Sequence, residues 1–268
     1  MSAAPLRVGR QDLFSLRQRL SDRDLQLLQY TGALRLLAAR QIQSLLFPDE
    51  QHATPRTAAR CCRRVLERLS QQQLLARLER RIGGARAGSA SHIYALTSLG
   101  QRVLDLDGPR RRLWEPSGFF VDHTLAVAEF VVQLVAASRS GAFELVEWQS
   151  EPECWRDVTT LGGRLVLRPD LFITVAVGEY ELRWFVEVDR GSEHLPTLLR
   201  KCRLYHTYYK NGTEQRDSGV FPRVLWITVD QHRADRLKEL LSADRRLTSS
   251  LFRVTTEPEA LAAIEDRT

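Results

Sequence analysis

The sequence RLVLRPDLFITVAVGEYELRWFVEVDR (164–190) contains two segments rich in aliphatic, β-branched and aromatic residues. Such segments are typical of β-strands, which we expect over 164–177 and 180–190. Gly178-Glu179 separates them, and glycine suits the tight turn that joins two antiparallel strands. The stretch therefore predicts a β-hairpin, and together with the segments around it a mixed α/β fold.

Acidic residues gather on one side of this predicted hairpin. Successive side chains point to opposite faces of a strand, so Glu187 and Asp189 share a face. Pairing about the Gly178 turn places Asp170 roughly opposite Glu187. Two such carboxylates repel one another, and burial adds to the cost unless a cation or a shared proton lies between them.

Paired carboxylates of this kind are hard oxygen ligands. They suit Mg²⁺ or Mn²⁺, and we expect Asp170 and Glu187 to bind such a metal, which would activate water and stabilise the charge on a phosphate. The alternative is a pair of structural acids neutralised by Arg168, Arg183 or Arg190.

The remainder of the second half predicts alternating helices and strands. We expect a helix over 121–137, a strand over 143–148, and a long irregular connection over 149–163 before the hairpin. The elements expected after the hairpin are a helix over 197–209, a strand over 223–230, a helix over 234–241, a short strand over 251–256, and a last helix. The predicted order is α-β-β-β-α-β-α.

This order, with RPD (168–170) and EVD (187–189), resembles the PD-(D/E)xK nuclease superfamily. The resemblance implies a restriction-endonuclease-like domain in which Asp170 and Glu187 bind metal. It also implies a lysine two residues after the second acid, but position 189 is Asp. Some members carry the lysine on the next helix, where Lys201 lies. Glu129 matches the extra acid that many members carry on the first helix.

The first half predicts a winged helix-turn-helix. Ser21-Asp22-Arg23-Asp24 is a helix N-cap signal, a second helix is expected over 38–47, and Thr54-Pro55 begins a third that runs to about Gln72. Two strand-like pieces, near 74–80 and 92–96, flank a tip rich in glycine, alanine, serine and arginine, which predicts the wing. A short helix over 98–104 follows.

Arginines are placed where such a domain contacts duplex DNA. The third helix enters the major groove and the wing lies along the backbone. Arginine suits both positions, because it binds phosphates and also binds guanine through two hydrogen bonds. The candidates are Arg56, Arg60, Arg63 and Arg64 on the helix, and Arg80, Arg81 and Arg86 on the wing. The alternative is a solvated arginine-rich helix that contacts only another protein.

The distribution of charged residues along the sequence also indicates two domains. Residues 1–112 carry 20 arginines against nine acidic residues, whereas residues 113–268 carry 19 basic residues against 24 acidic ones. The segment GPRRRLWEPSG (108–118) holds two prolines and three consecutive arginines, so it is not one regular element. We therefore expect a winged helix-turn-helix domain over 1–108, a linker over 109–118, and a nuclease-like domain over 119–268.

Composition excludes several classes of protein. With 43% hydrophobic residues the chain can form a core, and without an apolar run of eighteen residues it predicts no transmembrane helix. Four scattered cysteines predict neither a disulfide framework nor a zinc site, and a reducing cytoplasm is expected. No Walker motif, GxGxxG or GxSxG occurs, which disfavours nucleotide hydrolysis, dinucleotide chemistry and α/β-hydrolase chemistry.

The pairing of the two predicted domains resembles the bacterial replication-relaxation family. The resemblance rests on the winged helix, HTLAVAE (123–129), RPD, and EVDRGSE (187–193) with a lysine-bearing helix after it. It implies a DNA-binding protein of a plasmid or other mobile element, acting in replication, DNA relaxation or mobilisation. Expected partners are double-stranded DNA, a second copy of the chain, and replication or mobilisation proteins, with no membrane. Two other interpretations stay open: an active Mg²⁺- or Mn²⁺-dependent endonuclease, and a transcriptional regulator with an inactive nuclease-like scaffold.

Overall fold

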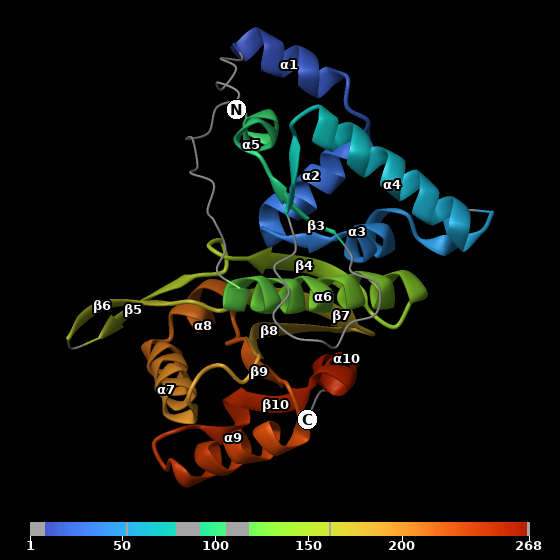
Figure 1. The fold of residues 1–268 in the computed structure, drawn as a ribbon. Helices are drawn as coiled ribbons and strands as arrows, with labels where there is room; N and C mark the ends of the chain where they lie inside the picture. The colour runs from blue at the N-terminus through green and yellow to red at the C-terminus, as the bar shows by residue number, and fades with distance from the viewer. Residues whose placement is uncertain (1–8, 52, 79–91, 106–117, 161, 267–268) are drawn as a thin grey trace. The chain divides into compact units, whose positions relative to one another are not determined.

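The structure is a computed structural model that describes residues 9–51, 53–78, 92–105, 118–160 and 162–266. The chain separates into two compact units, 1–128 and 129–268, and is of the mixed α/β class (Figure 1). The predicted linker over 109–118 lies almost wholly outside the described residues, so it stays a prediction.

The first unit consists of helices with a small antiparallel sheet. Its strands pair in the order β1-β3-β2. The elements in chain order are α1 (Arg10–Gln18), α2 (Asp22–Leu34), β1 (Leu37–Ala38), α3 (Ala39–Leu46), η1 (Asp49–Gln51), α4 (Pro55–Gln71), β2 (Leu75–Leu78), β3 (Ile93–Leu96), α5 (Ser98–Leu104), and the start of α6 (Gly118–Ser140). The sequence predicts α2, α3, α4, β2, β3 and α5, whereas α1 and β1 are further elements that it does not predict.

Capping side chains explain why these helices begin where the sequence predicts. Ser21 accepts a hydrogen bond from the Asp24 amide at the start of α2, Thr54 does the same for Thr57 at α4, and Thr97 for Gly100 at α5. Each bond satisfies a backbone donor that has no partner within its own helix. The core of the unit consists of buried aliphatic side chains, including Leu27, Leu28, Ile42, Leu45, Leu66, Leu69 and Leu74.

The second unit contains a five-stranded mixed sheet in the order β10-β9-β8-β7-β4. Strands β4, β7 and β8 pair antiparallel, whereas β8, β9 and β10 run parallel. Its elements are the rest of α6, β4 (Glu144–Ser150), β5 (Arg156–Thr160), β6 (Gly163–Leu167), β7 (Leu171–Val177), β8 (Tyr180–Asp189), α7 (Leu195–Asn211), α8 (Thr213–Ser218), β9 (Arg223–Thr228), α9 (Gln231–Ala243), η2 (Ser249–Leu251), β10 (Phe252–Thr256), η3 (Glu257–Glu259) and α10 (Ala260–Glu265).

The hairpin at the centre of this sheet has the register that the sequence predicts. Val177 pairs with Tyr180 across the Gly178 turn, and Leu171 pairs with Val186 at the far end. Just before β7, the Asp170 amide donates a 3.1 Å hydrogen bond to the Val186 carbonyl, one residue out of step with the Leu171–Val186 pair. Asp170 therefore lies at the end of this ladder, near enough to Glu187 for its charge to act on that residue.

Helices α7 and α9 cover the face of the sheet to which Glu187 points (Figure 1). Their buried residues form one core with the strands, including Phe172, Phe185, Leu198, Cys202, Tyr205, Val224, Trp226, Leu237 and Val254. Helix α10 contacts β8 and β10, and the Trp184 indole donates a 3.3 Å hydrogen bond to the Ile264 carbonyl. Because Trp184 and Phe185 are adjacent in β8, α10 lies on the opposite face from α7.

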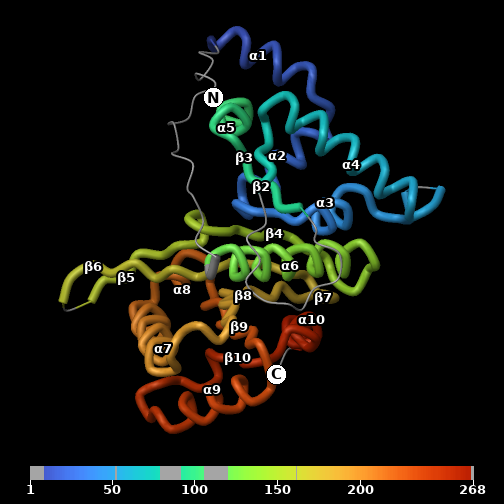
Figure 2. The backbone as a smooth tube through the Cα atoms, viewed as in Figure 1, coloured from blue at the N-terminus to red at the C-terminus, as the bar shows by residue number. Residues whose placement is uncertain are grey.

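Two sequence predictions for this half were wrong. The segment 149–163 is not irregular: β5 pairs with β6 in a separate two-stranded ribbon, visible in Figure 2. The strand predicted over 164–177 is two strands, interrupted at 168–170, because Pro169 has no amide hydrogen and cannot continue a ladder. Helix α8 was also missed. The segments that form β5 and α8 are short and polar, so they show no hydrophobic periodicity that would predict a strand or a helix. Contacts with neighbouring elements stabilise them.

Among the described residues, one helix is long and apolar enough by composition alone to cross a membrane. This is residues Phe120–Ser140 of α6. Core helices of soluble proteins share this length and composition. Phe130, Val131 and Leu134 of this helix are buried.

Candidate functional site

Glu187 lies near the carboxyl end of β8, and its side chain is only 2% exposed. Helix α7 supplies two donors to it. The Lys201 ammonium lies 2.5 Å from Oε2, and the Tyr205 hydroxyl donates to Oε1 at 2.5 Å. Lys201 and Tyr205 are four residues apart and therefore share a helix face. We call Asp170, Glu187, Lys201 and Tyr205 the Glu187 cluster.

Asp170 completes this cluster from the neighbouring strand. It is buried, and its Oδ2 accepts a 2.7 Å hydrogen bond from the Val188 amide. This bond links the residue before β7 to β8 and holds the Asp170 carboxylate beside Glu187. The predicted juxtaposition of the two acids is confirmed, and Lys201, from the predicted helix, is the cation that contacts Glu187.

The electrostatics of the cluster follow from burial. Removal from water raises the pKa of Glu187 to about 8; the nearby ammonium of Lys201 opposes this rise and the negative charge of Asp170 adds to it. For Lys201, burial works against the charged form, but Glu187 and Asp170 outweigh it and the pKa is raised. Burial, followed by the charge of Glu187, raises the pKa of Tyr205 well above its usual value, so its hydroxyl stays protonated and donates.

Asp189, at the position where the superfamily pattern has lysine, belongs to a different contact. Arg233 of α9 donates to Oδ2 of Asp189 at 2.6 Å and to Oδ1 at 3.1 Å. The Gly191 amide also donates to Asp189, and Arg233 donates to the Glu193 carbonyl. These bonds hold the loop between β8 and α7. Asp189 therefore caps the start of the loop that leads into α7.

Two of the three arginines considered as neutralising partners have other contacts. The Arg168 guanidinium stacks over the Trp155 ring at 4.7 Å, and Arg183 pairs with Glu181 at 3.2 Å. Glu129 is half-buried on α6, and its role at the site stays a prediction. The contact of Arg233 with Asp189 is not predicted from the sequence, because the two residues lie 44 positions apart and no local signal marks the pairing.

Contacts on two further sides fix α7, and hence Lys201, against the sheet. On one side, buried Glu214 of α8 accepts hydrogen bonds from Arg156 of β5 at 2.7 Å and from Tyr208 of α7 at 2.8 Å. The Arg156 guanidinium also lies 5.5 Å from the centre of the Phe185 ring. The β5–β6 ribbon is thereby attached to α7.

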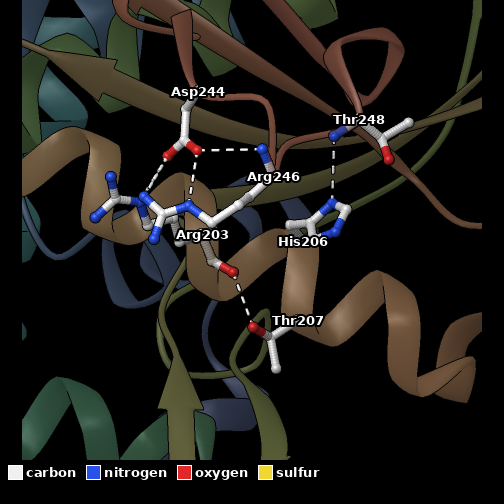
Figure 3. A network of polar contacts seen from close by, with 6 residues as sticks. All are labelled: Arg203, His206, Thr207, Asp244, Arg246 and Thr248. Atoms are coloured by element: carbon white, nitrogen blue, oxygen red, sulfur yellow. Dashed lines mark hydrogen bonds and ion pairs between the residues drawn. The ribbon is translucent and has the colours of Figure 1, made fainter.

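On the outer side of α7, Asp244 accepts 2.8 Å hydrogen bonds from Arg203 and from Arg246 (Figure 3). In the same view, His206 accepts a 3.3 Å hydrogen bond from the Thr248 amide. The two arginines hold the pKa of Asp244 below its usual range. These contacts join α7 to the segment that follows α9, so the helix carrying Lys201 is anchored at several points.

The donor set of the cluster is compatible with Mg²⁺ or Mn²⁺. Within the described residues, no group of three or more His, Cys, Asp or Glu side chains is placed to hold a metal ion. Mg²⁺ is, however, commonly bound by one or two carboxylates, with water and substrate phosphate completing its shell. Asp170 and Glu187 fit this arrangement, because two buried neighbouring acids favour a shared cation over mutual repulsion.

A second candidate surface lies in the first unit on α4. Arg56, Arg60, Arg63 and Arg64 are exposed, and none of them has a hydrogen bond or ion pair with another described residue. At 3.6 residues per turn they lie on one side of the helix, opposite its buried residues Ala58, Cys62, Leu66 and Leu69. The remaining wing candidates, Arg80, Arg81 and Arg86, lie outside the described residues.

Fold and sites together define a two-unit α/β protein with a buried carboxylate–lysine cluster in one unit and an arginine-lined helix in the other. The family model named replication-relaxation matches residues 28–224, well over half of the chain, and the protein belongs to this family. The matched region contains the Glu187 cluster and the α4 arginines. Comparison with curated proteins and with solved structures gives no match.

Proposed function

We propose that this protein binds the DNA of a plasmid or other mobile element, acts in its replication, relaxation or mobilisation, and cleaves phosphodiester bonds at the Glu187 cluster with Mg²⁺ or Mn²⁺. Family membership supports a role in replication or relaxation. The observation that carries the nuclease assignment is Lys201, whose ammonium lies 2.5 Å from Glu187 beside Asp170.

The first unit is proposed as the DNA-binding part. Helices α2, α3 and α4 followed by β2 and β3 have the order of a winged helix-turn-helix, with α4 as the recognition helix. Its exposed arginines lack partners within the described chain, so they are available to phosphates and base edges. Double-stranded DNA is the partner that this arrangement favours.

The second unit is proposed as a PD-(D/E)xK-like nuclease domain whose lysine lies on α7 instead of at position 189. Asp170 and Glu187 would hold the metal, which when bound supplies an activated water and stabilises charge on the phosphate. Lys201 provides a positive charge for the developing negative charge on phosphate oxygens. Arg233 and Asp189 hold the loop that leads into the Lys201 helix.

Cleavage of supercoiled plasmid with Mg²⁺ and with Mn²⁺ tests the proposal. Asp170→Asn, Glu187→Gln and Lys201→Met should each abolish cutting, and supercoiled substrate separates nicking from double-strand cleavage. Lys238→Met is the matched control, because Lys238 lies exposed on α9 with only a 4.0 Å contact to Asp235. Cutting that survives in the three variants would indicate a contaminant or another site.

A second candidate function is a transcriptional regulator with an inactive nuclease-like scaffold. Two observations favour it: an acid occupies position 189, and both oxygens of Glu187 already have donors from the chain. Under this alternative, the wild type binds duplex DNA but cuts with neither metal.

A further inference from the structure

Tyr205 is the one member of the Glu187 cluster to which the proposed chemistry gives no role. Its side chain is fully buried, and its hydroxyl donates to Oε1 of Glu187 at 2.5 Å while Lys201 contacts Oε2. The two donors therefore take different oxygens of one carboxylate. A carboxylate oxygen has two lone-pair positions, so one donor on each leaves acceptor capacity for a cation.

The Tyr205 ring is itself held in place. It packs against the Phe185 ring at a centroid distance of 5.6 Å and belongs to the core between α7 and the sheet. Phe185 lies two residues before Glu187 on the same face of β8. A rigid phenol thus fixes the end of the more flexible Glu187 side chain, which has three rotatable bonds.

We propose that Tyr205 is a positioning residue that holds the Glu187 carboxylate in the orientation in which it binds a divalent cation together with Asp170. The inference rests on the proposed metal-dependent function and adds to it a residue that touches neither metal nor DNA. Hydrogen-bonding partners of metal ligands orient them, and their loss typically reduces metal affinity by about 10- to 100-fold. The competing explanation is that Tyr205 only satisfies a buried acid.

Mn²⁺ binding to the full chain, measured by calorimetry and by the electron paramagnetic resonance signal of free Mn²⁺, distinguishes these explanations. Tyr205→Phe keeps the ring and removes the hydroxyl. Tyr208→Phe is the matched control, because Tyr208 is buried on the same helix and donates at 2.8 Å to another buried acid, Glu214. We expect Tyr205→Phe to weaken Mn²⁺ binding by about 10-fold or more, and Tyr208→Phe to leave it unchanged.

Urea unfolding of both variants controls for stability, since each loses one buried tyrosine–glutamate hydrogen bond. In a Glu187→Gln background, Tyr205→Phe should cause no further loss of Mn²⁺ affinity, because its effect passes through Glu187. Equal Mn²⁺ affinity of Tyr205→Phe and wild type would overturn the inference alone, as would equal weakening by both tyrosine variants. A wild type that binds no Mn²⁺ would overturn the proposed metal-dependent function and the inference with it.

Discussion

Neutralising the exposed face of α4 should weaken DNA binding without unfolding the first unit. The perturbation is the triple variant Arg56→Gln, Arg60→Gln and Arg63→Gln. These side chains are exposed and unpaired among the described residues, so their removal costs no internal contact there. Positions 56, 60 and 63 fall within roughly 60° of one another around the helix axis, and one DNA groove or strand can meet all three.

The expected magnitude comes from counterion release. Each phosphate contact contributes a slope of about −0.9 to log K against log salt concentration. Loss of three contacts should therefore reduce the magnitude of the slope by about 2.7. If one of the three reads a base, the slope changes by less and the loss of affinity depends on DNA sequence.

Fluorescence anisotropy with a labelled duplex, at NaCl concentrations from 50 to 200 mM, measures both slope and affinity. The control variant is Arg68→Gln on the same helix, because Arg68 lies 2.6 Å from buried Asp24. Its loss should lower the free energy of unfolding by about 1–3 kcal/mol and leave the salt slope intact. An unchanged slope in the triple variant, or a melting temperature lowered as much as in Arg68→Gln, would refute the assignment of α4 as a DNA-contacting surface.

Two further predictions concern the second unit. Because the pKa of Glu187 is raised to about 8 from 4.5, the native state binds a proton there that the unfolded chain releases. The free energy of unfolding of the wild type, taken relative to that of Glu187→Gln, should therefore fall as pH rises from about 4.5 to 8, by at most about 1.4 kcal/mol per pH unit. Parallel pH profiles of the two proteins in urea unfolding would contradict this. Arg233→Gln leaves the buried Asp189 carboxylate without its ionic partner and should cost about 3–5 kcal/mol of unfolding free energy. The double variant Arg233→Gln with Asp189→Asn should recover part of this loss, and a double variant as unstable as the single one would argue against the pair.

Several features of this protein followed from the sequence because local interactions specify them. The β7–β8 register depends on side-chain alternation about a single turn, so the proximity of Asp170 to Glu187 was predicted without knowledge of the rest of the fold. The start of α4 was predicted from Thr54 and Pro55, since a cap acts within one helical turn.

Only the tertiary structure determined the partners of the acids. Lys201 and Tyr205 carried a local signal, their four-residue spacing, but the orientation of α7 on the sheet decides that this face meets Glu187. Arg233 contacts Asp189 because β9 pairs with β8, and α9, which follows β9, lies on the face of the sheet to which Asp189 points. The β5–β6 ribbon likewise depends on α7 and on the Arg156–Glu214 contact. Such pairings join residues far apart in the chain, and periodicity and capping, which act over a few residues, carry no information about them.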